Sequence, residues 1–145
     1  MRYTSKLLIC SLSILCLFPS MAEASDWVEA LRTDNVLISI DRNSLRRTGT
    51  KVRTWVKWEW AVARESLDGA RRKYTASKEL SIYNCAERST HTVQAIRYAD
   101  NEMQTVVEDV SVKDVSSSYY EVVPDSIGEA LLEFSCNEIR GSARK

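Results

Sequence analysis

The sequence predicts one α+β domain in which a mainly antiparallel sheet is covered on one face by a C-terminal helix. Most of the chain after residue 24 alternates polar with β-branched or aromatic residues, which is typical of strands. Only the segment that starts near Ser126 has the apolar spacing of a helix. With 145 residues, 4 Gly, 2 Pro and no internal repeat, the chain is long enough for a single domain. We expect this domain over residues 25–139 and a polar tail over residues 140–145.

The N-terminus has the organisation of a secretory signal peptide. Two basic residues precede an apolar run over residues 7–18, and Ala22 and Ala24 then place small residues at positions −3 and −1 of a cleavage site. We expect residues 1–24 to be removed by a cut before Ser25. A retained anchor helix is the alternative, but the run falls short of the roughly 20 residues that span a bilayer.

The two cysteines of this segment do not predict a lipid anchor. Cys10 follows Ile9 and Cys16 follows Leu15, whereas lipoprotein processing requires a small residue before the modified cysteine. The sequence therefore predicts a periplasmic or secreted protein with no integral membrane span after cleavage.

Residues 35–41 and 51–62 are the first two predicted strands. A turn around Gly49 precedes the second, since glycine adopts positive φ without strain. Strict alternation assigns one face of this second strand to a group that we expect in the core: Val52, Thr54, Val56, Trp58, Trp60 and Val62. The opposite face carries Lys51, Arg53, Trp55, Lys57 and Glu59.

A polar connection over residues 63–72 leads to a third strand over residues 74–84. Its pattern places Leu80 and Ile82 inward and Tyr83 on the other face.

A hairpin follows, with flanks at residues 90–98 and 102–110 around a turn at residues 100–101. A last extended piece covers residues 119–123.

Pro124 ends this extended piece, and Ser126 with Glu129 has the spacing of a capping box. The helix that follows has a broad apolar arc made of Ile127, Ala130, Leu131, Leu132 and Phe134. Because this arc is wider than a flat surface needs, we expect the helix to nest in a concave sheet or to contact a partner chain as well.

Cys85 and Cys136 are the cysteines that remain after cleavage. In an oxidising compartment an isolated pair is most simply one disulfide, here tying the helix to the end of the third strand. Two free buried thiols are the alternative.

Composition excludes several functional classes. The chain has 20 basic and 20 acidic residues; cleavage removes Arg2, Lys6 and Glu23, which leaves 18 against 19 and a net charge near −1. A dedicated nucleic-acid binder usually carries a basic surplus. The only histidine, His91, provides neither a catalytic triad nor a histidine-rich metal site. We predict no catalytic residues, no metal and no cofactor.

The candidate ligand-binding residues are aromatic and basic. Trp55 lies between Arg53 and Lys57 on the charged face of the second strand, where cation–π stacking and an anionic partner are both compatible with its position. Arg46 and Arg47 add a basic run, as do residues 71–73. An anionic polysaccharide or an acidic protein surface is the expected partner, and solvated turn charges with a packed Trp55 are the alternative.

The order of several short motifs resembles the surface-adhesin protein E family. The first half contains Asp41-x-x-Ser44-Leu45-Arg46 and then Gly49-x-x-Val52-x-x-Trp55-Val56. The second half contains Ser77-Lys78-Glu79-Leu80 leading to Cys85, and Val123-Pro124-Asp125-Ser126 through Leu132 to Cys136. The resemblance covers about residues 27–136.

This resemblance implies a sheet of about six antiparallel strands, with the helix tethered on the concave face by a Cys85–Cys136 bond. It also implies possible homodimers. For the protein after which the family is named, it implies binding of host extracellular-matrix proteins such as vitronectin and laminin, of plasminogen and of haem. The expected function is thus an exported, non-catalytic, adhesin-like binding domain. The alternative is a periplasmic structural or assembly protein that uses its surface for homo-oligomer contacts.

Overall fold

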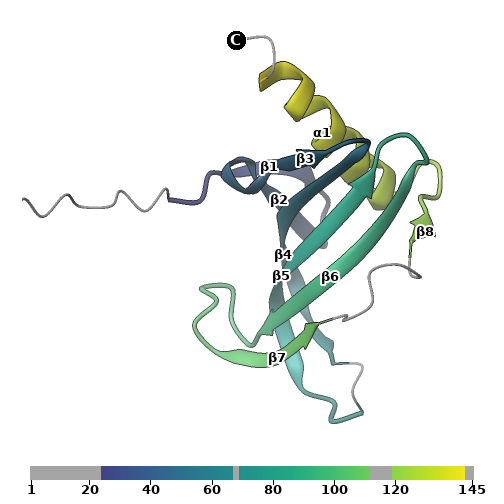
Figure 1. Ribbon diagram of the computed structural model, residues 1–145. Coiled ribbons are helices and arrows are strands. Elements are labelled where there is room, and N and C mark those ends of the chain that lie inside the picture. Colours follow the sequence, from purple (N-terminus) through teal and green to yellow (C-terminus); the bar gives the residue numbers. More distant parts are fainter. Residues whose placement is uncertain (1–23, 67–68, 112–118, 143–145) are drawn as a thin grey trace, which may run out of the picture.

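The computed structural model describes residues 24–66, 69–111 and 119–142, which form one antiparallel sheet and one long helix (Figure 1). Residues 1–23 lie outside the described residues, and the expected signal peptide with them. The strands are β1 (Trp27–Arg32), β2 (Val36–Asp41), β3 (Arg46–Thr48), β4 (Lys51–Glu65), β5 (Lys73–Asn84), β6 (Ser89–Tyr98), β7 (Val106–Ser111) and β8 (Tyr120–Glu121). A short 3-10 turn, Arg42–Ser44, joins β2 to β3, and helix α1 spans Ile127–Ser142.

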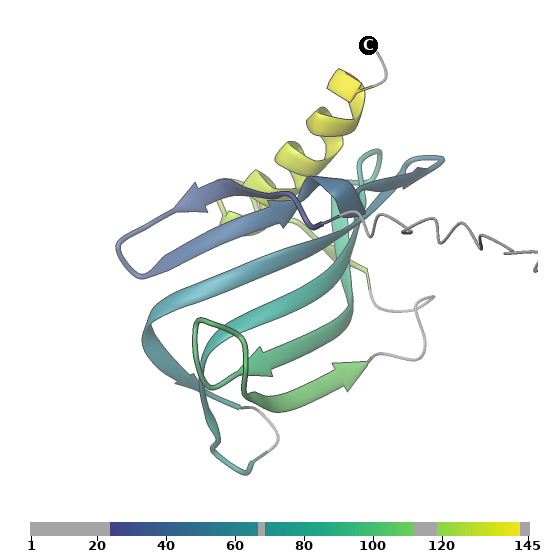
Figure 2. The same ribbon diagram turned by 90° about the vertical axis from the view of Figure 1, so that its left-hand side faces the viewer.

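Among the described residues the sheet contains eight strands, which is more than the expected number of about six. Its continuous path is β1-β2-β4-β5-β6-β7, and every pair is antiparallel. Two short strands add to this path, because β3 pairs with the start of β4 and β8 with the start of β6. Figure 2 shows the long strands β4, β5 and β6 side by side, with α1 at one end of the sheet.

Two irregularities account for the differences between prediction and structure in β1 and β4. A register shift between Glu29 and Leu31 interrupts the alternation of β1, a strand that the sequence pattern did not predict. A second shift lies between Glu59 and Arg64, and beyond it β4 extends into the predicted polar connection. The expected core position of Val62 is therefore wrong: this side chain is 73% exposed.

The main core lies between α1 and one face of the sheet, which is called the helix face below. Its buried members are Val36, Ile38, Ile40, Val56, Tyr83, Leu131, Leu132 and Cys136, with Trp58 and Trp60 packed against them. Residues paired across antiparallel strands point to the same side, so Tyr83, opposite Val52, belongs to this face. Leu80 is buried on the other face. The sequence predicted that Leu80 and Ile82 point inward and Tyr83 to the other face. In the structure Tyr83 is the residue that faces the helix.

The start of α1 confirms half of the expected capping box. Ser126 Oγ accepts a hydrogen bond from the Glu129 amide at 3.3 Å. The Glu129 carboxylate instead accepts from the amide of Asp125, at 2.7 Å. The helix thus begins where the sequence predicted it, with one of its two capping bonds shifted by one residue.

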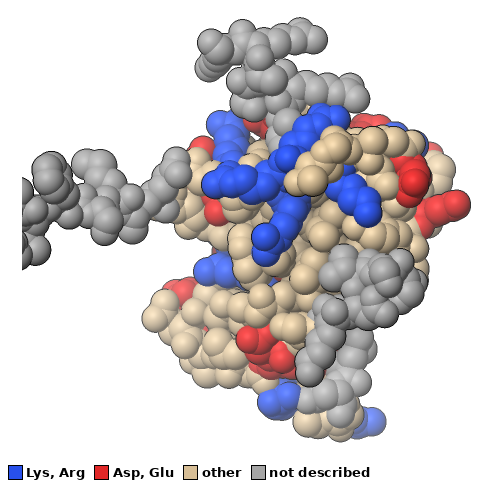
Figure 3. Space-filling view, viewed as in Figure 1, with Lys and Arg blue, Asp and Glu red and all other residues tan. Residues whose placement is uncertain are grey.

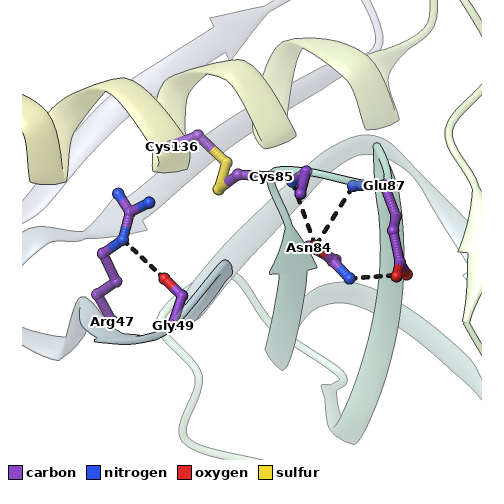
Figure 4. Close-up of a disulfide and its surroundings, with 7 residues drawn as sticks. Arg47, Gly49, Asn84, Cys85, Glu87 and Cys136 are labelled. Carbon is purple, nitrogen blue, oxygen red and sulfur yellow. Dashed lines mark hydrogen bonds between the residues drawn. A yellow bond between two sulfur atoms is a disulfide. The ribbon is translucent and has the colours of Figure 1, made fainter.

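The expected disulfide joins Cys85, just after β5, to Cys136 in α1 (Figure 4). Asn84 organises the turn beside it: its side-chain oxygen accepts from the amides of Ala86 and Glu87, and its amide nitrogen donates to the Glu87 carboxylate at 2.8 Å. The bond and this turn fix the helix against the sheet at the end where β3 and the start of β4 lie.

Candidate binding surface

Four basic side chains project from β3 and the start of β4, and they are called the basic hairpin below. They are Arg46, Arg47, Lys51 and Arg53, and all four are exposed. Gly49 closes the turn with a φ of 61°, a conformation that side-chain-bearing residues seldom adopt. Figure 3 shows Lys and Arg side chains gathered in the part of the surface where Figure 1 places β3.

Within the basic hairpin, Arg46 lies directly opposite Arg53 in the β3–β4 pair. Like charges directly opposite one another on antiparallel strands are destabilising. Arg46 donates to the carbonyls of Asn43 and Leu45, at 2.9 and 2.8 Å. Arg47 donates to the Gly49 carbonyl at 3.0 Å (Figure 4). None of the ion pairs between described residues includes Arg46, Arg47 or Arg53.

The structure divides the candidate residues between the two faces of the sheet. Arg46, Arg53, Trp55 and Lys57 share the face away from the helix, whereas Arg47 lies opposite the buried Val52 and belongs to the helix face. Trp55 is half-buried beside Arg53. The sequence thus placed Arg53, Trp55 and Lys57 on a common face, and strand pairing adds Arg46 to them.

Lys57 differs from the other candidates because its charge is used within the molecule. Its ammonium group lies 2.9 Å from the Glu59 carboxylate and 5.6 Å from the ring centroid of Trp27. Lys78 also lies over Trp27, at 5.9 Å, and over the ring of Tyr98, at 5.8 Å. Trp27 and Lys78 were not recognised from the sequence, since only the strand order β1-β2-β4-β5 brings them near Lys57.

Three further observations concern the remaining functional classes. Among residues 24–66, 69–111 and 119–142, no group of His, Cys, Asp and Glu side chains has the arrangement of a metal site. His91 is buried and packs against the ring of Tyr119 at a centroid distance of 5.5 Å. No helix in the described part of the chain is long and apolar enough to cross a membrane.

The fold is similar to solved structures of protein E from Haemophilus influenzae. One crystal form superimposes with a TM-score of 0.56 at 16% identity, over 83% of this chain and 94% of that chain. A second structure of the same protein gives a TM-score of 0.54 at 16% identity, over 83% and 91% of the two chains. At this identity the likeness shows a common fold. No curated protein sequence matches the chain.

The sequence itself matches a family model described as surface-adhesin protein E over residues 27–137. This span runs from the first residue of β1 to the residue after Cys136, and it includes the basic hairpin and the disulfide. The chain therefore belongs to the surface-adhesin protein E family.

Proposed function

We propose that the chain is an exported, non-catalytic binding domain that attaches to an acidic surface of a partner protein through its basic hairpin. The observation that carries this proposal is the direct opposition of the exposed Arg46 and Arg53, with no carboxylate of the described residues paired to either. A carboxylate supplied by a partner relieves this repulsion, and each guanidinium can accommodate it with two parallel hydrogen bonds.

The surroundings of the two arginines support a protein partner. Trp55 continues the same face of β4 and offers a half-buried aromatic surface next to Arg53. Tryptophan and arginine are enriched among the residues that carry most of the energy of protein interfaces. Because the family is one of surface adhesins, the partner expected for this domain is a host extracellular-matrix protein or an envelope protein. In this proposal residues 1–24 direct export and residues 25–139 form the binding domain.

A binding assay on immobilised extracellular-matrix proteins tests the proposal. The test variant replaces Arg46, Arg47 and Arg53 with Gln. The matched control replaces residues 71–73, the other basic run, which also removes three positive charges but lies by the opposite end of β4. We expect the test variant to lose binding at least tenfold and the control to bind like the unmodified protein. Equal losses in both variants would show that only total charge matters.

A second function, homo-oligomer contact, is favoured by the edge of β7, beyond which no strand lies in the described part of the chain. This strand ends the sheet path, and Val106 and Val110 on it are 56% and 42% exposed. An uncovered edge strand with apolar side chains is a template for pairing with another chain. Sedimentation analysis tests this alternative: Val110→Lys should convert an oligomer to monomers, and a protein that is already monomeric at micromolar concentration contradicts it.

A further inference from the structure

A pocket of about 390 Å³ lies on the helix face, toward the end of β4 that is remote from the basic hairpin. Three aromatic side chains line it, Trp58, Trp60 and Tyr74, together with the charged Glu79 and Arg64. We call this site the aromatic pocket. It shares no residue with the basic hairpin.

The walls of the aromatic pocket contain three packed rings, whose faces are electron-rich. Trp58 and Trp60 stand nearly parallel, with centroids 6.0 Å apart, and Tyr74 meets Trp60 edge-on at 5.3 Å. Such ring faces attract cations. The protein already uses them in this way, because the Arg64 guanidinium lies 5.6 Å from the Trp60 centroid and the Arg97 guanidinium lies 5.1 Å from that of Tyr74.

Glu79 provides negative charge in the same pocket. It lies opposite Val56 in the β4–β5 pair, which places it on the helix face, and it accepts a hydrogen bond from the Ser77 hydroxyl at 3.2 Å. Burial raises the pKa of Glu79, and this effect outweighs the hydrogen bond from Ser77, the positive charge of Arg97 and the polar edge of Trp58, which all lower it.

Arg97, the half-buried cation whose charge acts on Glu79, is already engaged by another acid. Arg97 forms an ion pair with Glu108, which lies directly opposite it on β7. The positive charge of Arg97 therefore acts on Glu79, but its ion pair is with Glu108. Arg64, the remaining cation of the pocket, is exposed and stacked on Trp60 at the rim.

We propose that the aromatic pocket binds a small organic cation. The ammonium group lies against Glu79, where it offsets the cost of a partly desolvated carboxylate, and the carbon atoms lie against the three rings. This site is additional to the binding surface proposed above and accepts a ligand of the opposite charge to the hairpin's partner.

Choline and its uncharged isostere 3,3-dimethyl-1-butanol test the role of charge directly on the unmodified protein. Titration is followed by the indole N–H signals in ¹H–¹⁵N spectra, where the chain's 4 tryptophans can be assigned by single Trp→Phe variants. We expect choline to shift the signals of Trp58 and Trp60 while those of Trp27 and Trp55 stay in place. The isostere should bind at least tenfold more weakly. Equal binding of both compounds, or binding of neither, overturns the proposal.

Three variants identify the groups responsible. Glu79→Gln should weaken choline binding at least tenfold, whereas Glu102→Gln removes the same charge from an exposed loop position and should have no effect. Arg64→Ala should strengthen choline binding, because it removes a competing cation from the face of Trp60. If benzoate binds better than choline and Arg64→Ala abolishes that binding, the pocket is an anion site and the proposal is wrong.

The comparison of choline with its isostere uses the unmodified protein. It therefore still tests whether the pocket binds a cation if the Glu79→Gln protein fails to fold. The basic-hairpin variant should bind choline normally. Loss of matrix binding and loss of choline binding are therefore independent results, and each proposal can fail without the other.

Discussion

Removal of the Cys85–Cys136 disulfide tests how far the fold depends on a covalent link between sheet and helix. The two cysteines are 51 residues apart in the sequence, so the bond closes a large loop of the unfolded chain. In the chain-entropy model a loop of this size stabilises the folded state by about 4 kcal/mol at 25 °C. Typical domains have a free energy of unfolding of roughly 5–15 kcal/mol, so the expected loss is a large fraction of the total.

The double variant Cys85→Ala, Cys136→Ala should nevertheless fold. In the disulfide-bonded protein Leu131 and Leu132 are each 2% exposed in the core against the sheet, and this apolar contact does not require the bond. Urea unfolding followed by tryptophan fluorescence measures the free energy of unfolding for both proteins. We expect a decrease of about 4 kcal/mol, with a lower midpoint of the transition.

The unmodified protein in excess reductant is the control and should match the double variant. A decrease of less than about 1 kcal/mol would refute the reasoning, because it would mean that the bond hardly restricts the unfolded chain. Quantitative alkylation of both cysteines without reductant would show two free thiols instead, the alternative that the sequence left open.

Three further predictions concern the core and two carboxyl groups. Leu131→Ala should lower the free energy of unfolding by about 3 kcal/mol in urea titrations, because it opens a cavity under α1. Glu79 has a raised pKa, so stability should fall as pH rises from its ordinary value of 4.5 through its folded pKa; Glu79→Gln should flatten this part of the stability–pH curve. Hydrogen bonds from the Gln104 and Thr105 amides lower the pKa of Asp100, so the stability they give is lost as pH falls below the ordinary value of 3.8; acid unfolding of Asp100→Asn should lack this component.

The helix, the disulfide and the long strand β4 were predictable because each has a local signal. The serine that begins the capping box lies one residue before α1, and alternation through Trp60 correctly assigns the inner face of β4. The elements that were missed lack such a signal. The register shift in β1 disrupts its alternation, and the shift after Glu59 moves Val62 out of the core.

The candidate sites depend more strongly on strand order than the fold does. The sequence grouped Arg53, Trp55 and Lys57, yet the opposition of Arg46 to Arg53 follows only from the register of a three-residue strand. The aromatic pocket combines residues of β4 and β5 with Val36 of β2 and Ile127 of α1. Nothing local to Glu79 indicates that burial raises its pKa, since its desolvation comes from neighbours on other strands.

The measurement that most directly tests the basic hairpin as the binding surface is the salt dependence of affinity for a matrix protein that binds. Affinity of the unmodified protein and of the control variant at residues 71–73 should fall steeply between low and high salt, because exposed charge pairs are screened. The variant at Arg46, Arg47 and Arg53 should bind weakly with little dependence on salt. A triple variant that keeps the affinity and the salt dependence of the unmodified protein would contradict the account.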